Sequence, residues 1–475
     1  MLTEIMKAKI IKIVLAALVV YITAGAFLPH IYKSSPLPRP AETTVLNRKW
    51  RHYEDRAIPD LLKIIADPRE AYALRIAMLR EAESSLDIAY FAVSNTDCGD
   101  AFLSELLDAA DRGVKVRLLV DAKMGSLSRS SQRILAAYPG IEMAVYNPVN
   151  LLKPWTLNES LHDKFIIADN KYLLLGGRNI EPYYFALNGP LTSTKYDWDV
   201  FAVKDDPDAP EGDSIVDAAG AYNELLWEAT QLKRIKPGLA KESQAERFRR
   251  SAERFAGRYP EFYEKELEAF CKDMIRPERV MLLHNPLNEG RKEPWIANDL
   301  EELSREAKRS VLIQTPYATA APALLNFLKE TANTVPVYYM TNSFASAKNP
   351  PAYSNYYFQR DKFLETGINI YEYQDSDSIH GKSIIIDDHI AIIGSFNLDS
   401  RSTYLDTETM LVIDSKAFTE SFSEKYEDLV EKSLKVNEDN RYDPAEKDQA
   451  ARVPPVKRVF YLLVYMVLRP FQYFL

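Results

Sequence analysis

The chain has 475 residues, of which 47% are hydrophobic, and its formal net charge is -9. This length and apolar content suit two domains or one large two-lobed domain, and they exclude a disordered chain. The negative charge gives no general attraction to polyanions, so sequence-independent binding of nucleic acid is not favoured. The only cysteines, Cys98 and Cys271, form no zinc-binding pattern and no disulfide scaffold, although a single disulfide between them stays open.

The first 30 residues predict a membrane segment. Three lysines precede an uncharged run at residues 13–28. A spanning helix needs about 20 apolar residues, which residues 10–28 supply if Lys12 reaches toward the lipid headgroups. The sequence Ala-Gly-Ala at residues 24–26 also fits a cleavage site, so a removed signal peptide is the alternative. We expect an uncleaved anchor at residues 1–30 in the cell membrane, with the basic end in the cytoplasm and the catalytic part outside it.

After the anchor, a linker rich in Pro and Ser is expected at residues 31–68. An α/β unit is then predicted at residues 69–236, because apolar residues at helical spacing alternate with short buried strands. The strands are expected at residues 86–93, 114–121 and 141–147.

The same order of elements returns at residues 279–435, with strands expected at residues 310–317, 335–341 and 368–374. Helix, strand, helix, strand, strand occurs twice, which indicates an internal duplication. The predicted fold class is therefore α/β, with two similar lobes made of mixed sheets flanked by helices.

Two further segments lie outside these units. Residues 237–278 are highly charged with scattered aromatic residues, and they predict a helical connector whose surface is solvated rather than functional. Residues 436–475 begin with a polar stretch and include an apolar run at 459–468 with basic flanks. This run is too short to span a bilayer, so it either lies in the membrane interface or packs on the protein's own surface.

In each unit these strands are followed by a copy of one motif, in which five residue types recur at identical offsets. The first copy contains His162, Lys164, Asp169, Gly176 and Asn179, and the second contains His380, Lys382, Asp387, Gly394 and Asn397. In a strand a residue and its second neighbour face the same side, so each copy presents an imidazole beside an ammonium group. A match of this length is hard to produce by chance, and it predicts function rather than two unrelated surface histidines.

Two imidazoles, two ammonium groups and two amides at one point suit the transfer of a phosphodiester. One histidine attacks phosphorus while the other protonates the departing alkoxide, and the lysines and asparagines stabilise the redistributed charge. No metal or cofactor is expected, because the fixed donors would take its place and two cations make a poor metal site.

Other residues of the motif are assigned supporting roles. Asp169 and Asp387 stand at strand ends before turns, and we expect them to fix the backbone. The pairs Gly176-Gly177 and Gly394-Ser395 let the chain turn closely beside the histidines. Each histidine also needs a carboxylate that orients its far nitrogen, and the candidates in the strands that follow are Asp199 and Glu408.

The stretches HDKFIIAD with GGRN and HGKSIIID with GSFN resemble the paired HxKxxxxD signatures of the phospholipase D superfamily. The stretches GGRNIEPYYF, YDWDV, TNS and GSFNLDSRS are similar to those of bacterial cardiolipin synthases of the C type. The resemblance covers residues 69–435 and implies one active site between two lobes, with a phosphohistidine intermediate. It would make His162 the nucleophile and His380 the general acid, or the reverse. Gly177 stands where the superfamily often has Ser.

Membrane attachment favours a lipid substrate over nucleic acid. The leading hypothesis is therefore a membrane-attached phosphatidyltransferase, similar to cardiolipin synthase, that acts on phospholipids such as phosphatidylglycerol. The alternatives are a hydrolytic phospholipase D, a nuclease of the same superfamily, and a non-catalytic lipid-binding protein. Intact His and Lys residues in both copies argue against the last of these.

Overall fold

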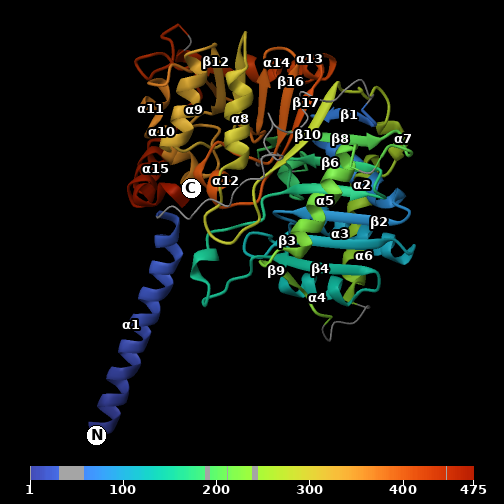
Figure 1. Ribbon diagram of the computed structural model, residues 1–475, viewed down its shortest axis with the longest axis horizontal. Coiled ribbons are helices and arrows are strands. Elements are labelled where there is room, and N and C mark those ends of the chain that lie inside the picture. The colour runs from blue at the N-terminus through green and yellow to red at the C-terminus, as the bar shows by residue number, and fades with distance from the viewer. Residues whose placement is uncertain are drawn as a thin grey trace.

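The computed structural model describes residues 2–31, 58–187, 193–210, 212–237, 244–445 and 447–474. The chain forms two α/β lobes, each built on a mixed eight-stranded sheet with helices packed against it (Figure 1). A long helix, α1 (Leu2–Ile31), projects from the body close to the C-terminus. The predicted α/β class and the duplication into two lobes are confirmed.

The first sheet has the strand order β1-β8-β6-β5-β2-β3-β4-β9. Its strands are β1 (Asp60–Ile65), β2 (Ser85–Tyr90), β3 (Lys115–Asp121), β4 (Ile141–Tyr146), β5 (Lys164–Ala168), β6 (Tyr172–Gly176), β8 (Asp199–Lys204) and β9 (Leu232–Arg234). Strands β2, β3 and β4 are parallel, and they are the three strands expected from the sequence. The remaining neighbours pair antiparallel.

The second sheet repeats this arrangement in the order β10-β17-β16-β15-β11-β12-β13-β18. Its strands are β10 (Arg279–His284), β11 (Val311–Gln314), β12 (Val337–Asn342), β13 (Asn369–Tyr373), β15 (Ser383–Ile386), β16 (Ile390–Gly394), β17 (Thr409–Asp414) and β18 (Ser433–Lys435). The parallel strands β11, β12 and β13 again match the three that were expected. Position by position the two orders correspond, so each motif has an equivalent place in its own sheet.

Helices cover both sheets. The first lobe carries α2 (Pro68–Glu81), α3 (Asp97–Asp111), α4 (Arg129–Ala137), α5 (Ile215–Glu228), α6 (Glu246–Arg258) and α7 (Leu267–Phe270). The second carries α8 (Trp295–Arg305), α9 (Pro322–Ala332), α10 (Pro350–Tyr357), α11 (Arg360–Leu364), α12 (Ser400–Tyr404), α13 (Lys416–Glu424), α14 (Glu427–Glu431), α15 (Pro455–Leu468) and the 3₁₀ segment η8 (Arg469–Phe474). Asp67 caps α2 by accepting a hydrogen bond from the Glu70 N–H, and Pro68 opens that helix.

The first lobe is larger at both ends than the sequence indicated. Strand β1 lies inside the segment expected to be a linker, and it pairs with β8 because its apolar side chains alternate into the core. Residues 32–57 of that segment lie outside the described residues.

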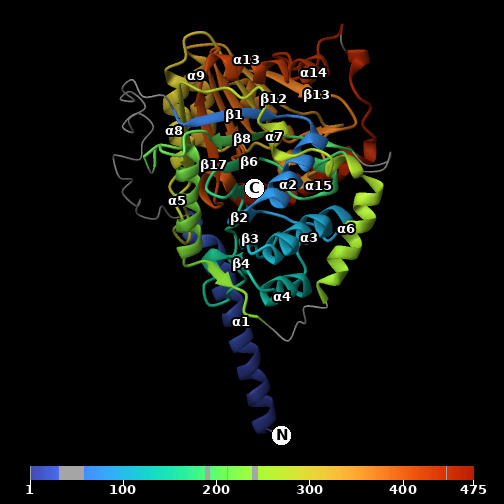
Figure 2. The ribbon, with the colours of Figure 1, turned by 90° about the vertical axis from the view of Figure 1, so that its right-hand side faces the viewer.

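The expected solvated connector also belongs to this lobe. Helix α6 lies beside α2 and α3 (Figure 2). Phe255 and Phe262 pack on Tyr72 of α2, with ring centroids 5.4 and 5.0 Å apart. Phe248 and Phe255 are spaced by two helical turns, so one side of the charged helix is buried.

Two features bear on the predicted membrane attachment. Residues Met6–Leu28 of α1 have a mean hydropathy of 2.3 and are long and apolar enough to cross a membrane, by length and composition. The C-terminal apolar run forms α15, in which Tyr461 alone is buried. Cys98 and Cys271 are free thiols, and Cys98 is buried.

Candidate active site

The two motif copies have closely similar local structures. Strands β5 and β6 form one antiparallel pair and β15 and β16 form the other. The side chain of Asp169 accepts hydrogen bonds from three successive backbone N–H groups, those of Glu83, Ser84 and Ser85. Asp387 accepts from the equivalent groups of Lys308, Arg309 and Ser310. Both aspartates have positive φ, and their hydrogen bonds hold the turn against the neighbouring strand.

Each histidine is held by the backbone of the opposite lobe. The N–H of His162 donates to the carbonyl of Thr407, 3.2 Å away, next to a parallel bridge between Leu161 and Thr407. The N–H of His380 donates to the carbonyl of Tyr196, 2.6 Å away. This second contact continues the short parallel pair of β7 (Lys195–Tyr196) with β14 (Ser378–Ile379). At the site, therefore, the backbone of each lobe binds the histidine of the other lobe.

The orienting carboxylates cross over in the same way. Nδ1 of His162 lies 2.9 and 3.0 Å from the carboxylate oxygens of Glu408 in the second lobe. Nδ1 of His380 lies 2.5 Å from Oδ2 of Asp197 in the first lobe. A carboxylate at Nδ1 fixes the ring and leaves Nε2 available for chemistry. Glu408 does contact a histidine, but that of the first motif rather than of its own, and the carboxylate at His380 is Asp197 rather than Asp199.

Asp199 has a different place from the one expected. Its Oδ2 lies 2.9 Å from guanidinium nitrogens of both Arg75 and Arg178, and all three side chains are buried. The hydrogen-bond register explains the difference: Gly177 N–H donates to Trp198 O as Ser395 N–H donates to Thr409 O. Asp197 and Glu408 each precede the accepting residue, so they are equivalent, whereas Asp199 corresponds to Met410.

Gly177 and Ser395 match the lengths of these two carboxylates. A Cβ added at Gly177 would overlap the carboxylate of Asp197, so the glycine makes room for the shorter acid. In the second lobe the hydroxyl of Ser395 donates to the longer acid, Glu408. The glycine at the position where the superfamily often has Ser thus accompanies an aspartate in place of a glutamate.

The lysines complete a compact cationic centre. Lys164 and Lys382 are buried, and each ammonium donates to the backbone carbonyl of the histidine two residues before it. Lys382 Nζ also lies 2.6 Å from Nδ1 of His380 and 3.7 Å from Asp197. Each motif therefore presents its imidazole and its ammonium together, as strand geometry predicts.

Burial sets the protonation of these groups. It lowers the pKa of Lys164 to about 8 and that of Lys382 to about 7, against the attraction of Glu408 and Asp197 respectively. Burial, and then the neighbouring lysines, hold the pKa of both histidines well below the usual range. A neutral imidazole with its proton on Nδ1 has a free lone pair on Nε2, as a nucleophile requires.

The two asparagines lie at equivalent bridges. Asn179 precedes Ile180, which bridges to Val93, and Asn397 precedes Leu398, which bridges to Ala318. Both amides are buried, and the Oδ1 atom of each is without a hydrogen-bond partner among the described residues. Among those residues no group of three or more His, Cys, Asp or Glu side chains could hold a metal ion.

Tyr184 distinguishes the two histidines. Its buried hydroxyl lies 3.3 Å from Nε2 of His380, and its ring packs edge-on against the imidazole. His162 instead packs against Phe91, with ring centroids 5.0 Å apart. The centre is symmetric in its charged groups and asymmetric in the groups around them.

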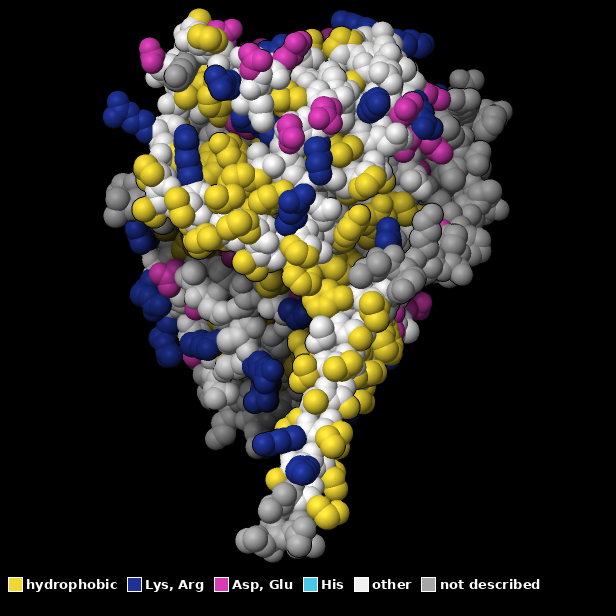
Figure 3. Space-filling model, turned by 90° about the vertical axis from the view of Figure 1, so that its left-hand side faces the viewer, with side chains coloured by type: hydrophobic (Ala, Val, Ile, Leu, Met, Phe, Trp, Pro, Cys, Tyr) yellow, Lys and Arg dark blue, Asp and Glu magenta, His cyan; other side chains and the backbone are white. Residues whose placement is uncertain are grey.

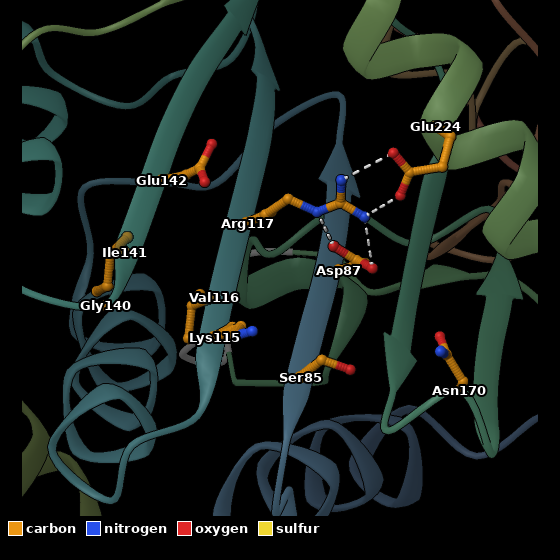
Figure 4. Close-up of a pocket in the computed structure, with 10 residues that line it drawn as sticks. All are labelled: Ser85, Asp87, Lys115, Val116, Arg117, Gly140, Ile141, Glu142, Asn170 and Glu224. Atoms are coloured by element: carbon orange, nitrogen blue, oxygen red, sulfur yellow. Dashed lines mark hydrogen bonds and ion pairs between the residues drawn. The ribbon is translucent and has the colours of Figure 1, made fainter.

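A pocket of about 630 Å³ in the first lobe lies away from this centre. It lies at the Ser85 end of β2, whereas Lys164 of the motif pairs with Tyr90 at the opposite end. Its guanidinium, Arg117, points between Asp87 and Glu224 and binds both (Figure 4). Arg117 is thus already paired with two carboxylates, and the pocket is separate from the centre that the two motifs form.

Comparison with known proteins agrees with the duplicated centre. The sequence family described as cardiolipin synthase, PLD-like domain, matches residues 76–204 and 300–430, one match in each lobe. The chain belongs to this family. It is 24% identical to an uncharacterized protein of Helicobacter pylori (strain J99), over 86% of this chain and 87% of that protein. It is 26% identical to cardiolipin synthase C of Escherichia coli (strain K12), over 75% of this chain and 82% of that protein.

The fold is also that of a solved structure, phosphatidylserine synthase of Haemophilus influenzae Rd KW20. The TM-score is 0.61 at 15% identity, and the match covers 87% of this chain and 95% of the other. This member of the cardiolipin synthase, PLD-like domain family therefore has the two-lobed fold that its motifs predict.

Sequence reasoning missed two residues of the centre, Asp197 and Tyr184. Both lie within stretches that resemble cardiolipin synthases, YDWDV and GGRNIEPYYF. Asp197 and Asp199 are two residues apart and face the same side of an extended chain, so alternation does not separate them. Only the hydrogen-bond register does so.

Proposed function

We propose that this protein is a membrane-attached phosphatidyltransferase of the cardiolipin synthase type. The observation that carries the proposal is the crossed pairing of His162 with Glu408 and of His380 with Asp197, beside two buried lysines. The substrate would be a phospholipid such as phosphatidylglycerol, and the enzyme would transfer its phosphatidyl group to the hydroxyl of a second lipid.

In the first step Nε2 of His162 forms a bond to phosphorus, and the bond from phosphorus to the leaving oxygen breaks. His380 gives its Nε2 proton to that oxygen, so a neutral alcohol departs. An anionic phosphodiester between Lys164 and Lys382 would raise the pKa of His380 toward that of a proton donor. In the second step the acceptor hydroxyl gives its proton to His380, and its oxygen displaces His162 from phosphorus.

The surroundings of the two histidines support this order of roles. A nucleophile needs an open lone pair, and the structure records no hydrogen-bond partner for Nε2 of His162 among the described residues. A proton donor needs a fixed direction, and Tyr184 lies against Nε2 of His380. The carboxylates at Nδ1 would stabilise each imidazolium as it forms.

Leaving-group dependence tests these roles. With a phosphatidyl ester of p-nitrophenol the leaving group needs no proton, so His380→Ala should regain much of the lost rate of the first step, measured as a burst of p-nitrophenolate in a single turnover. His162→Ala should stay inactive, because no other group forms the bond to phosphorus. Rescue of His162→Ala alone would reverse the assignment, and product from both variants with the natural lipid would refute the site.

The overall reaction can be tested in cells that lack cardiolipin synthases. Mass spectrometry should detect cardiolipin when the wild-type chain is expressed, and none with either histidine variant. Phosphatidic acid without cardiolipin would instead show the hydrolytic phospholipase D activity. Release of the full-length protein by alkaline carbonate would contradict the spanning anchor, and protease access from the cytoplasm would contradict an extracytoplasmic catalytic part.

A further inference from the structure

The end of α1 contacts the body through two hydrogen bonds and through packed aromatic rings. The hydroxyl of Tyr21 donates to the carbonyl of Leu152, and Nδ2 of Asn158 donates to the carbonyl of Ala26. Phe27 packs against the rings of Phe471 and Phe474 in η8, with centroids 5.3 and 5.0 Å apart. Helix α1 therefore leaves the body between the loop at 149–158 and the C-terminal segment.

One side of α15 packs against the second lobe. Lys457 donates to the carbonyls of Phe344, Ala345 and Ala347, and Tyr461 donates to the carbonyl of Ala347. Tyr465, one further turn along, stacks on Phe358. Contacts at every fourth residue fix the rotation of the helix, so its opposite side has a defined direction.

That opposite side is apolar and exposed. Leu463 is 52% and Val467 67% exposed, and the loop on the other side of α1 exposes Leu152 to 80%. Together with Val149, Phe460 and Phe471 these residues form what we call the apolar collar. Figure 3 shows hydrophobic side chains gathered around the root of α1 and over the adjoining part of the body.

The collar is connected to the active site through Arg401. Its guanidinium donates to the carbonyl of Asn158 at 2.9 Å, to Oγ of Ser160 at 3.3 Å and to the carbonyl of Phe474 at 3.4 Å. Asn158 also holds α1, and Ser160 lies two residues before His162. One side chain thus contacts the loop, the C-terminal segment and the stretch of chain that leads to His162.

We propose that the apolar collar lies in the membrane interface, so that the active site works against the bilayer surface. The occupant of this surface is lipid, because the collar adjoins α1, the helix long and apolar enough to cross a membrane. Contacts with α1 run from Tyr21 to Phe27, about 9 Å along a helix at ~1.5 Å per residue. Interfacial segments reach a similar depth of about 5–10 Å.

The chemistry of the collar also fits lipid. Its exposed side chains are aliphatic and aromatic, and Lys457, Arg458 and Arg469 flank or interrupt the run, as in segments that bind anionic bilayers. A collar at this depth would bring the lipid headgroup to the level of the loop that ends at His162. The inference deepens the proposed function, but it rests on that function only for the activity assay below.

Fluorescence quenching tests the position of the collar. In a Cys271→Ser background the remaining native thiol, Cys98, is buried. A cysteine introduced by Leu152→Cys or Leu463→Cys carries an environment-sensitive label, and the full chain is placed in nanodiscs of phosphatidylcholine and phosphatidylglycerol. The matched control is Val430→Cys in α14, at the opposite end of the body from α1 and 44% exposed (Figure 1). Lipids with a quencher on the acyl chain should reduce emission roughly twofold or more at positions 152 and 463 and not at 430.

This measurement does not depend on turnover, so it tests whether the apolar collar lies in the membrane interface even if the proposed function is wrong. Emission at both collar positions that is as insensitive to the lipid quencher as at position 430 would overturn the proposal. Shielding that grows with the number of protein copies in each nanodisc, without quenching by lipid, would also overturn it by assigning the surface to a second copy.

An activity assay tests the consequence for catalysis. Leu152→Glu and Leu463→Glu should lower turnover of phosphatidylglycerol in bilayers about tenfold, because a charged side chain resists insertion. With dihexanoyl phosphatidylglycerol, dissolved as monomers, both variants and the control Val430→Glu should match the wild type. If both collar variants turned over bilayer lipid at the wild-type rate, the proposal would be overturned. If the wild-type protein turned over neither the bilayer lipid nor the dissolved lipid, the proposed function would be overturned instead.

Discussion

At one pair of equivalent positions the first lobe has charged side chains and the second lobe has apolar ones. In the first lobe Arg178 follows Gly177, and Asp199 pairs with Gly176 in the sheet. In the second lobe Phe396 and Met410 take those positions, since Met410 pairs with Gly394. A buried ion pair in one lobe thus corresponds to two apolar side chains in the other. The lobes agree in the histidine and lysine that each brings to the proposed active site, and at this pair of positions they differ in their cores.

A second difference lies within the site itself. Asp197 with Gly177 and Glu408 with Ser395 place a carboxylate at the same nitrogen of the histidine across the interface. The shorter acid needs a closer backbone, and the longer acid leaves room for a hydroxyl that hydrogen-bonds it. These two local differences leave the contact between carboxylate and histidine the same in both halves of the site. Substitutions at equivalent positions of the two lobes can therefore be compared directly.

The largest effect is expected where the lobes agree. Asp197→Asn and Glu408→Gln should each lower activity roughly 10²- to 10⁴-fold, because the imidazolium of the opposite lobe loses its counter-charge. Steady-state kinetics with phosphatidylglycerol measures this loss, and circular dichroism should show an unchanged fold. With the p-nitrophenyl ester, the burst of p-nitrophenolate from the first step should recover in Asp197→Asn and not in Glu408→Gln, since only Asp197 acts through the proton donor.

Asp199→Asn is the matched control for Asp197→Asn. It should keep nearly wild-type activity per folded molecule at low temperature, because Asp199 binds Arg75 and Arg178 rather than a histidine. If Asp199→Asn lost as much activity as Asp197→Asn, the assignment of the orienting carboxylate would have to be exchanged.

Stability should show the reverse pattern. Asp199→Asn leaves two buried guanidinium groups without their counter-charge, and we expect a loss of about 3–5 kcal/mol of folding free energy. At the equivalent position of the second lobe, Met410→Leu exchanges apolar side chains of similar volume and should cost less than about 1.5 kcal/mol. Thermal unfolding in detergent compares the two. Equal midpoints would mean that the arginines find other partners when the aspartate is removed.

Gly177 and Ser395 offer a smaller test. Gly177→Ala should displace Asp197 and lower kcat roughly 10- to 100-fold, because small shifts of catalytic groups are costly. Ser395→Ala only removes a hydrogen bond to Glu408 and should lower kcat about tenfold or less. Single-turnover kinetics compares the variants, and a greater loss in Ser395→Ala would contradict the role given to the glycine.

The motif made most of this architecture predictable from sequence. Repeated offsets from His162 to Asn179 and from His380 to Asn397 predicted the duplication, and strands of alternating or apolar character predicted the sheets. The crossover was not predictable, because Asp197 and His380 are far apart in sequence and meet only through the pairing of β7 with β14. The spacing of Phe248 and Phe255 indicates the buried side of α6 in the sequence. The many charged residues of this segment led instead to the prediction of a solvated helix.

The smallest effect is expected in the pH dependence, and it distinguishes the two lysines. A lysine is charged below its pKa, so it stabilises the phosphodiester at low pH and loses that ability as pH rises through the pKa. Because burial lowers the pKa of Lys382 to about 7 and that of Lys164 to about 8, kcat/KM should fall first with Lys382. Arginine stays charged throughout this range. Lys382→Arg should therefore shift the alkaline limb of the kcat/KM profile upward, until Lys164 limits it. Lys164→Arg should leave the limb in place, and the opposite pattern would reverse the order of the two lysines.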